Sequence, residues 1–413
     1  MTLDPVHVKE IAALAHLIDG DLDGDEHRDF AATVWESYLD PLWLDDRRVV
    51  EPVADQHRGT VRIDDIALID PPFAVTHGLD AGTLNPTTYR NGCVVDVAHA
   101  AMAREPSDHG LHRRRSIVGA VHVHDPSRSI GSDWHQFDAQ YGRRKLLEAP
   151  QVDRFVEGVV HTCGLYHAEL EHVHWTLDAV EEVLLLDGPI YPNELLRWQD
   201  RHPALATLVR THPLPAELLD RSVSLHEAGL SRDLPIVGFV KNPTSNRLTR
   251  AIRSAGHPAP WFNDAALFRH VLDPTDHVDR PADHLGFSNW FISRAGTDAT
   301  FARDTDTALR PTLAPPVDRF EVTFMMIYDP RDGIVYRAEA PLGVVATADV
   351  RDRITRLLLR AVAAERGPPR AIQKADRLAG ISRGEKASLR RLFESTWSTA
   401  IDMTYDDRRW GLE

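Results

Sequence analysis

The chain has 413 residues, 43% of them hydrophobic, so it can build a large core without disulfide or metal crosslinks. Its two cysteines, Cys93 and Cys163, have no metal-ligand spacing, which excludes a disulfide scaffold and a cysteine-based zinc site. A net charge of −15 argues against binding nucleic acid through a strongly basic overall charge. No run approaches the ~18 apolar residues of a membrane span, and the acidic N-terminus lacks a basic leader, so we expect a cytoplasmic protein without membrane contact.

Lysine is scarce in this sequence. Only five of the 47 basic residues are lysines, namely Lys9, Lys145, Lys241, Lys374 and Lys386, and acidic residues are spread along the whole chain. This composition is typical of proteins from a very salty cytoplasm, so the overall charge is a weak guide to the ligand. Local groups of charged residues are therefore more informative.

The first predicted unit is helical. Residues 5–55 carry apolar residues at helical spacing on both sides of an acidic Gly/Asp segment. We assign residues 1–58 to an N-terminal helical extension and residues 59–413 to the main domain.

Residues 75–85 contain the first candidate site residue, because their apolar run stops at Asp80 with Gly82 just beyond. Such a strand end can present a metal-binding carboxylate at the edge of a sheet. Aspartate also stabilises turns after strands, so Asp80 alone leaves both roles open. Residues 93–102 and 116–124 predict two further strands, and the three together predict a meander.

His122 and His124 alternate along the third of these strands and could share a zinc ion. No third ligand follows at metal spacing, and the chain has 22 histidines, so we interpret the two as a chance pair. A metal hydrolase built on these two histidines remains an alternative.

Residues 152–180 have the apolar spacing of a helix that lies between strands. At about 100° per residue, Glu169 lies roughly 60° from the centre of the apolar stripe and Glu171 roughly 140° from it. We therefore expect Glu169 to look toward the sheet edge and Glu171 to face water. An ordinary surface role remains possible for both.

The second strong pattern is the apolar run of residues 182–187, which predicts a central strand buried on both faces and ending at Asp187. If this strand lies beside the strand of Asp80, the two carboxylates approach within a few ångströms. Both then stay ionised at low cost only with a cation between them. A hard divalent metal satisfies this requirement.

A third apolar strand, residues 234–241, ends on Lys241 at the same predicted edge, where an ammonium group suits a phosphate. Arg247 follows close by. The other predicted elements are helices over residues 192–230 broken at Pro203 and Pro213, a strand over 288–294, a hairpin over 320–341, a helix over 350–364, and a last helix over 371–382. Asp376 in this last helix could complete a metal site.

In order, these pieces resemble the NurA family of nucleases. The most specific stretches are GLDAGTLNPTTYRNG, LLLDGPI, IVGFVKN and KADRLAGIS, and the resemblance runs from about residue 70 to about residue 390. It implies an α/β fold with a ribonuclease H-like mixed sheet flanked by helices. Together with the scarcity of lysine, it leads us to expect a haloarchaeal source.

The resemblance also implies a function. NurA nucleases are manganese-dependent (or Mg²⁺-dependent) DNA nucleases with 5′ to 3′ exonuclease and single-strand endonuclease activity. They act as a homodimer with a HerA-type hexameric ATPase in double-strand break repair. Carried over residue by residue, the catalytic residues are Asp80, Glu169, Asp187 and Lys241, the metal ligands are Asp80, Glu169, Asp187 and Asp376, and the expected DNA contacts are Lys241, Arg247, Lys374 and Arg377. Glu171 remains the alternative to Glu169.

Two departures from the family pattern concern the last helix. Asp376 stands where many members have His, and a carboxylate there keeps a harder oxygen donor for a metal. Pro368 stands where many members have the Tyr of a Tyr-Pro pair, so any role of that hydroxyl is absent or moved. The alternative function is therefore an inactive relative that binds nucleic acid or docks on an ATPase.

Overall fold

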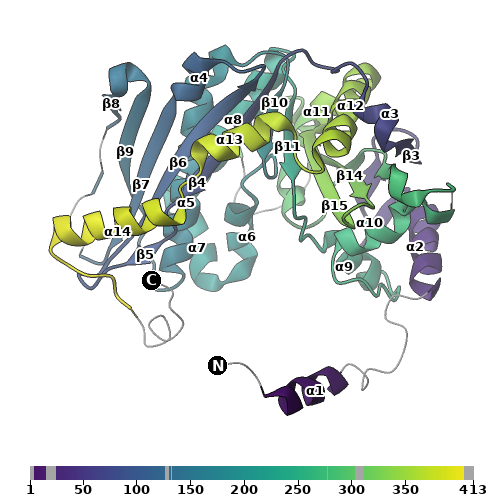
Figure 1. The fold of residues 1–413 in the computed structure, drawn as a ribbon, viewed down its shortest axis with the longest axis horizontal. Helices are drawn as coiled ribbons and strands as arrows, with labels where there is room; N and C mark the ends of the chain where they lie inside the picture. Colours follow the sequence, from purple (N-terminus) through teal and green to yellow (C-terminus); the bar gives the residue numbers. More distant parts are fainter. Residues whose placement is uncertain are drawn as a thin grey trace.

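A single mixed sheet with helices on both faces forms the body of the protein (Figure 1). The computed structural model describes residues 4–14, 25–125, 130–131, 133–276, 278–302 and 311–403. Within these residues the sheet has 15 strands, and its main path runs in the order β1-β2-β13-β14-β15-β11-β10-β4-β6-β7-β9-β8. β3 and β12 pair with each other, β12 also pairs with β14, and β5 pairs with β6.

The strands are β1 (Leu42–Leu44), β2 (Arg47–Pro52), β3 (Arg58–Arg62), β4 (Thr76–Thr83), β5 (Thr87–Thr88), β6 (Cys93–Glu105), β7 (Arg115–Val123), β8 (His135–Phe137), β9 (Gly142–Glu148), β10 (Leu184–Asp187), β11 (Ile236–Val240), β12 (His284–Ser288), β13 (Phe291–Ser293), β14 (Val322–Asp329) and β15 (Ile334–Pro341). The helices are α1 (Pro5–Ala13), α2 (Asp25–Tyr38), α3 (Ile63–Ala67), α4 (His109–Arg113), α5 (Val156–Thr176), α6 (Asn193–Arg201), α7 (Pro203–Thr211), α8 (Pro213–Ser231), α9 (Arg247–Ser254), α10 (Asp264–Leu272), α11 (Leu342–Val345), α12 (Ala348–Glu365), α13 (Arg370–Ala379) and α14 (Arg383–Trp397). Short 3₁₀ helices are η2 (Asp138–Gln140), η3 (Leu177–Ala179), η4 (Pro274–Asp276), η5 (Pro281–Asp283), η6 (Gly296–Phe301) and η7 (Val317–Phe320).

The centre of the sheet consists of three parallel neighbours, β4, β10 and β11. Their apolar residues are buried on both faces, as Leu184, Leu185 and Val237 illustrate with no exposed surface. β6 and β7 continue the sheet antiparallel beyond β4, and β15 and β14 continue it antiparallel beyond β11. The three parallel strands therefore end at one common edge.

Separate apolar clusters anchor the helices to the two faces of this sheet. One cluster joins Leu185, Phe239 and Met325 to α12 and to Ile372 of α13. On the opposite face, Leu79, Leu184 and Ile236 pack with residues of α5 and α8, while α2, α9 and α10 cover β13 and β14. The fold therefore has three layers, with the helices α12 and α13 on one side and α5 to α10 on the other.

Helix α13 lies directly on β4 because both surfaces are nearly free of side chains at the contact. Ala371, Ala375 and Ala379 are fully buried at helical spacing. An added Cβ at Gly78 or Gly82 of β4 would collide with backbone atoms of Ala371 or Ala379, respectively. Side chains alternate along a strand, so Asp80, between these two glycines, lies on the same face as α13.

The predicted fold class, a mixed sheet flanked by helices with further helices at the N-terminus, is confirmed. The meander is confirmed as β4, β6 and β7, and the adjacency of the strands of Asp80 and Asp187 is confirmed as the parallel pair β4 and β10. The prediction that the first strand stops at Asp80 is wrong. β4 continues to Thr83 because residues 80–83 stay paired with β6.

The N-terminal prediction is correct for α1 and α2 but wrong for residues 42–52, which form β1 and β2 at the edge of the sheet. β2 pairs with β13, and Phe30 of α2 stacks on Trp261 at 5.6 Å between ring centroids. The division at residue 58 stays an interpretation, because contacts of this kind also join neighbouring domains. No helix in the described part of the chain has the length and apolar character of a membrane span.

We predict that Gly78→Ala lowers the free energy of unfolding by about 1–3 kcal/mol, because the new methyl group forces α13 away from β4. Urea unfolding measures this loss. The matched control is Gly119→Ala in β7, where the nearest atom to an added Cβ is Leu146 Cγ at 4.0 Å. Equal effects of the two substitutions would contradict the close packing of α13 on β4.

Candidate active site

Three charged side chains meet where β10 and β11 end beside β4. Leu79 of β4 is paired with Leu186 of β10, so Asp80 and Asp187 follow at neighbouring positions on the same face. Lys241 comes directly after β11, and its Nζ donates to Asp187 Oδ2 at 2.6 Å. The parallel pairing of these strands therefore brings together residues from three distant parts of the sequence.

The ion pair of Lys241 and Asp187 is partly shielded from water. The Asp187 side chain is 8% exposed and the Lys241 side chain 37%. Burial raises the pKa of Asp187 and Lys241 opposes that rise, while Asp376 adds to it. Burial alone would lower the pKa of Lys241, but Asp187 and the other carboxylates raise it. The lysine is thus a fixed positive charge among several acids.

The pKa values of Asp80 and Glu169 are both raised in this arrangement. Burial, followed by repulsion from Asp187 and Asp376, raises the pKa of Asp80 to about 7. Burial also raises the pKa of Glu169 well above its usual value, and the charges of Asp80 and Asp187 add to the rise. Lys241 alone therefore does not neutralise the group, which favours the uptake of protons or of a further cation.

Glu169 reaches this group from α5, on the other face of the sheet. It lines a cavity of about 170 Å³ together with Asp187 and apolar residues such as Leu79 and Leu186. Tyr166 and Tyr191 also line the cavity. The cavity gives the carboxylates one partly apolar wall, and this explains why burial is the largest cause of the pKa shift at Glu169.

The expectation that Glu171 faces water is wrong. Its side chain is 15% exposed and pairs with Arg221 of α8 at 2.7 Å and with Arg143 of β9 at 3.7 Å. Burial lowers the pKa of Arg143 to about 10, although Glu171 acts in the opposite direction. The structure therefore brings Glu169, and not Glu171, to the carboxylates of Asp80 and Asp187.

Asp376 is exposed on α13, and its charge acts on Asp80, Asp187 and Lys241. Pro369 caps the N-terminus of the helix, and the carbonyl of Pro368 accepts a hydrogen bond from Gln373 Nε2 at 2.9 Å. The packing of α13 on β4 thus places the predicted fourth ligand where its charge acts on Asp80 and Asp187. Pro368 and Pro369 therefore form part of the N-terminal end of α13.

The donor chemistry of this site fits a hard divalent cation. Its candidate ligands are all carboxylate oxygens, which Mg²⁺ and Mn²⁺ prefer, and burial, followed by repulsion from neighbouring carboxylates, raises the pKa values of Asp80 and Glu169. Within the described residues, however, no three His, Cys, Asp or Glu side chains already stand close enough to hold a metal ion. Binding would therefore require small movements of these side chains, and Asp187 would have to share its oxygens with Lys241.

The predicted DNA contacts differ in their surroundings. Lys374 pairs with Glu105 and donates to Ser107 Oγ at 2.9 Å, while Arg377 is exposed beside Asp376. Arg247 bonds to Asp298 and Thr297, and its side chain is only 13% exposed. This internal placement argues against Arg247 as a DNA contact, because its guanidinium already has buried partners.

His122 of β7 and His124, just after the strand, do not form a metal centre with any third residue that the structure describes. His122 is 1% exposed, and its ring lies 5.0 Å from that of His124 in an edge-to-face arrangement. Burial lowers the pKa of His122, so the neutral ring is favoured. His122 is therefore a buried part of the sheet, whereas His124 is exposed directly after the strand.

The sequence analysis assigned no role to Arg337 and Glu339, which are buried charges within the apolar strand β15. The signal was present in the sequence, because a central strand does not bury two charged residues without partners. Glu339 accepts a hydrogen bond from the amide of Ile190, in the loop that follows Asp187.

The fold and site define an α/β protein with a group of carboxylates and one lysine at the ends of parallel strands. A family model for the NurA domain matches residues 164–381, slightly more than half of the chain, and the chain therefore belongs to the NurA family. Comparison with curated proteins finds no match.

Solved structures with a similar course of the chain include two NurA proteins. The NurA nuclease from Sulfolobus solfataricus is 11% identical, with a TM-score of 0.48 over 96% of this chain and 97% of that one. NurA bound to dAMP and manganese is 9% identical, with a TM-score of 0.44 over 95% and 98%. Membership of the family rests on the domain match.

The raised pKa of Asp80 predicts a pH-dependent stability in the absence of metal. The folded protein keeps the Asp80 proton up to about pH 7, whereas an unperturbed carboxyl releases it near 3.8. Between these values the folded state binds more protons, so its free energy of unfolding falls as pH rises. Asp80→Asn removes this dependence. We expect the variant to gain on the order of 2–4 kcal/mol over wild type between pH 4 and pH 8 in EDTA.

Urea unfolding of both proteins at several pH values measures this gain, which includes the change in the pKa of Glu169 when the charge of Asp80 is removed. A difference between variant and wild type that does not change with pH would contradict the electrostatic account of Asp80.

Proposed function

We propose that this NurA-family protein is a metal-dependent nuclease that hydrolyses phosphodiester bonds of DNA. The observation that supports this proposal most strongly is the convergence of Asp80, Asp187 and Glu169 beside Lys241. Crowded carboxylates with raised pKa values favour divalent cations, and an adjacent lysine favours an anionic substrate. Divalent cations would offset the negative charge of the carboxylates, and a DNA phosphate would offset the positive charge of Lys241.

In this proposal Asp80, Glu169 and Asp187 would hold two Mn²⁺ or Mg²⁺ ions, with Asp376 as a fourth ligand. The bound cations supply activation of a water molecule and stabilisation of the leaving oxygen. Lys241 releases part of its hold on Asp187 and binds the phosphate, where its ammonium offsets the charge that develops during cleavage. Asp80 and Glu169 would have to be ionised to hold the cations, since a metal-ligating carboxylate carries no proton. No covalent nucleophile is needed.

Membership of the NurA family is the basis for a more specific proposal about the cleavage activity and the partners. We infer a 5′ to 3′ exonuclease with single-strand endonuclease activity that processes DNA ends in double-strand break repair in the cytoplasm. The protein would act as a homodimer with a HerA-type ATPase, and Lys241, Lys374 and Arg377 are the candidate DNA contacts. Lys374 must leave Glu105 to reach a phosphate.

A second candidate function is an inactive relative that binds nucleic acid or docks on an ATPase. The observations that favour it are Asp376 and Pro368 at the positions of the family's His and Tyr, and the absence of a preformed metal cluster among the described residues. A manganese-dependent cleavage assay on single-stranded DNA separates the two functions, because the second predicts binding without cleavage.

We predict that Asp80→Ala and Asp187→Ala each abolish cleavage, with a loss of at least about a thousandfold in kcat, because each removes a ligand that the cations require. Both variants should stay folded, since removing one of several repelling carboxylates relieves a strain on the folded state. Cleavage of labelled DNA with Mn²⁺ and thermal unfolding measure the two effects. Full activity of either variant with metal present would contradict the assignment of Asp80 and Asp187 as metal ligands.

Glu169 and Glu171 provide a matched pair on one helix. Glu169→Gln should lose manganese-dependent cleavage, because the amide cannot replace a charged ligand. Glu171→Gln should keep it, because Glu171 pairs with Arg221 and Arg143 away from the site. Activity is measured at equal folded concentration. The opposite ranking would assign the ligand to Glu171.

A further inference from the structure

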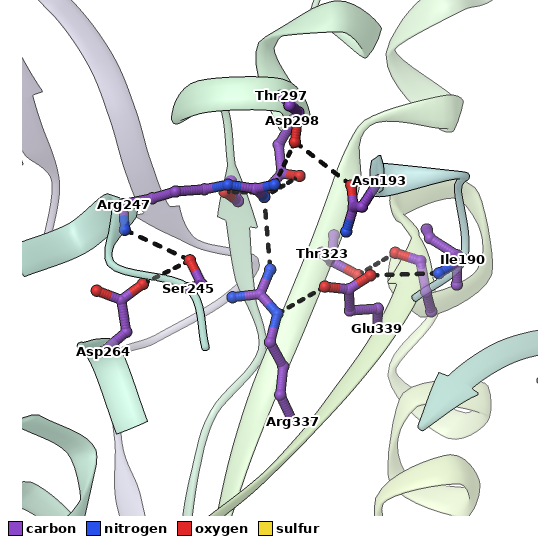
Figure 2. A network of polar contacts seen from close by, with 12 residues as sticks. Ile190, Asn193, Ser245, Arg247, Asp264, Thr297, Asp298, Thr323, Arg337 and Glu339 are labelled. Carbon is purple, nitrogen blue, oxygen red and sulfur yellow. Dashed lines mark hydrogen bonds and ion pairs between the residues drawn. The ribbon is translucent and has the colours of Figure 1, made fainter. Parts of the chain in front are cut away.

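Glu339 of β15 holds the loop that follows Asp187. Its Oε2 accepts a hydrogen bond from the amide of Ile190 at 3.3 Å, and its Oε1 accepts one from Nε of Arg337 at 2.6 Å (Figure 2). Ile190 comes only three residues after Asp187. Glu339 is therefore connected to a proposed metal ligand through a short length of backbone.

This loop lies flat against the sheet. Glu339 is paired with Gly238 of β11, and a Cβ at Gly238 would lie 2.5 Å from the carbonyl oxygen of Gly188 and 2.9 Å from the nitrogen of Ile190. The amide of Gly188 also donates to the carbonyl of Phe239 at 3.1 Å. The backbone after Asp187 is thus held at Gly188 by β11 and at Ile190 by Glu339.

The same network reaches the segment that follows Lys241. Arg337 Nη2 lies 3.6 Å from Asp298 Oδ2, and Asp298 also pairs with Arg247, the first residue of α9. Figure 2 shows this chain of contacts running from Ile190 through Glu339, Arg337 and Asp298 to Arg247. One buried network therefore joins the segments that follow both members of the Lys241 and Asp187 pair.

The members of this network are almost fully buried, with exposed fractions of 4% for Arg337, 3% for Glu339 and 2% for Asp298. Two guanidinium groups, including that of Arg247, face the carboxylates of Glu339 and Asp298, and the buried carboxylate of Asp264 also acts on Arg247. Buried ion pairs of this kind add little stability compared with apolar residues of the same size, but their bonds fix one geometry. We therefore expect the network to fix the positions of the segments that it joins and to add little to the free energy of unfolding.

We propose that Glu339, supported by Arg337, is a positioning residue that sets the position of the Asp187 carboxylate for a divalent cation. This inference rests on the proposed function. Groups that orient metal ligands typically contribute about tenfold to a hundredfold to metal affinity. Glu339→Gln leaves one carbonyl oxygen for two donors, so either Ile190 or Arg337 loses its hydrogen bond.

The matched control is Glu321→Gln. Glu321 is 5% exposed and accepts two hydrogen bonds from Arg294, at 2.8 and 2.7 Å, and Arg294 also pairs with Glu51. It is therefore a buried carboxylate bonded to an arginine, like Glu339, but its side chain holds no part of the loop after Asp187. Both substitutions should cost similar stability, and only Glu339→Gln should act on the metal site.

The test measures Mn²⁺ affinity of the full chain by isothermal titration calorimetry, the Mn²⁺ concentration for half-maximal cleavage, and KM for a DNA oligonucleotide. We expect Glu339→Gln to weaken Mn²⁺ binding about tenfold or more, with KM for DNA unchanged, and Glu321→Gln to leave Mn²⁺ binding within about twofold of wild type. If Glu339→Gln does not fold, the double variant Arg337→Met/Glu339→Leu replaces it, because that variant removes both charges together.

Unchanged Mn²⁺ affinity in the Glu339 variant, or an equal loss in the Glu321 variant, would overturn the positioning role. These results differ from a failure of the proposed function. In that case wild-type protein itself would neither bind Mn²⁺ at this site nor cleave DNA, and both proposals would fall together.

Discussion

Repulsion among carboxylates at the ends of β4 and β10 is the constraint on which the site depends. The parallel register sets Asp80 beside Asp187, α5 adds Glu169, and α13 adds Asp376. Lys241 offsets part of this charge through its bond to Asp187. Burial, together with repulsion from Asp187 and Asp376, raises the pKa of Asp80 to about 7. A carboxyl with this pKa exchanges its proton near neutral pH, and in the proposed chemistry a divalent cation would take the place of that proton.

The rest of the structure maintains this crowding in two ways. Gly78 and Gly82 let α13 lie against β4, so Asp376 of α13 approaches Asp80 of β4. Beneath the opposite face, Arg337 and Glu339 hold the loop after Asp187 through bonds that balance their own buried charges. Neither arrangement contributes a group to the reaction directly. Both hold backbone segments that carry the acids, and in the proposed function this restraint would position the carboxylates for a metal ion.

The sequence was sufficient to predict the central strands and the candidate site, because continuous apolar runs ending in Asp187 and Lys241 are characteristic of buried parallel strands. It was not sufficient for β1, β2, β8, β9 and α14, which are short or polar and acquire their structure from neighbours distant in the chain. The environment of Glu171 depends on Arg143 and Arg221 from other elements, and helical spacing cannot reveal such partners. The same holds for Arg247, whose burial follows from its contact with Asp298.

The most direct test of the account is the position of manganese in crystals of the protein soaked with Mn²⁺, located by anomalous scattering. The account predicts a peak between the carboxylates of Asp80 and Asp187 within reach of Glu169, with Lys241 displaced from its present bond to Asp187. A protein that cleaves DNA with Mn²⁺ but shows no peak there, or binds the metal at His122 and His124 instead, would contradict it.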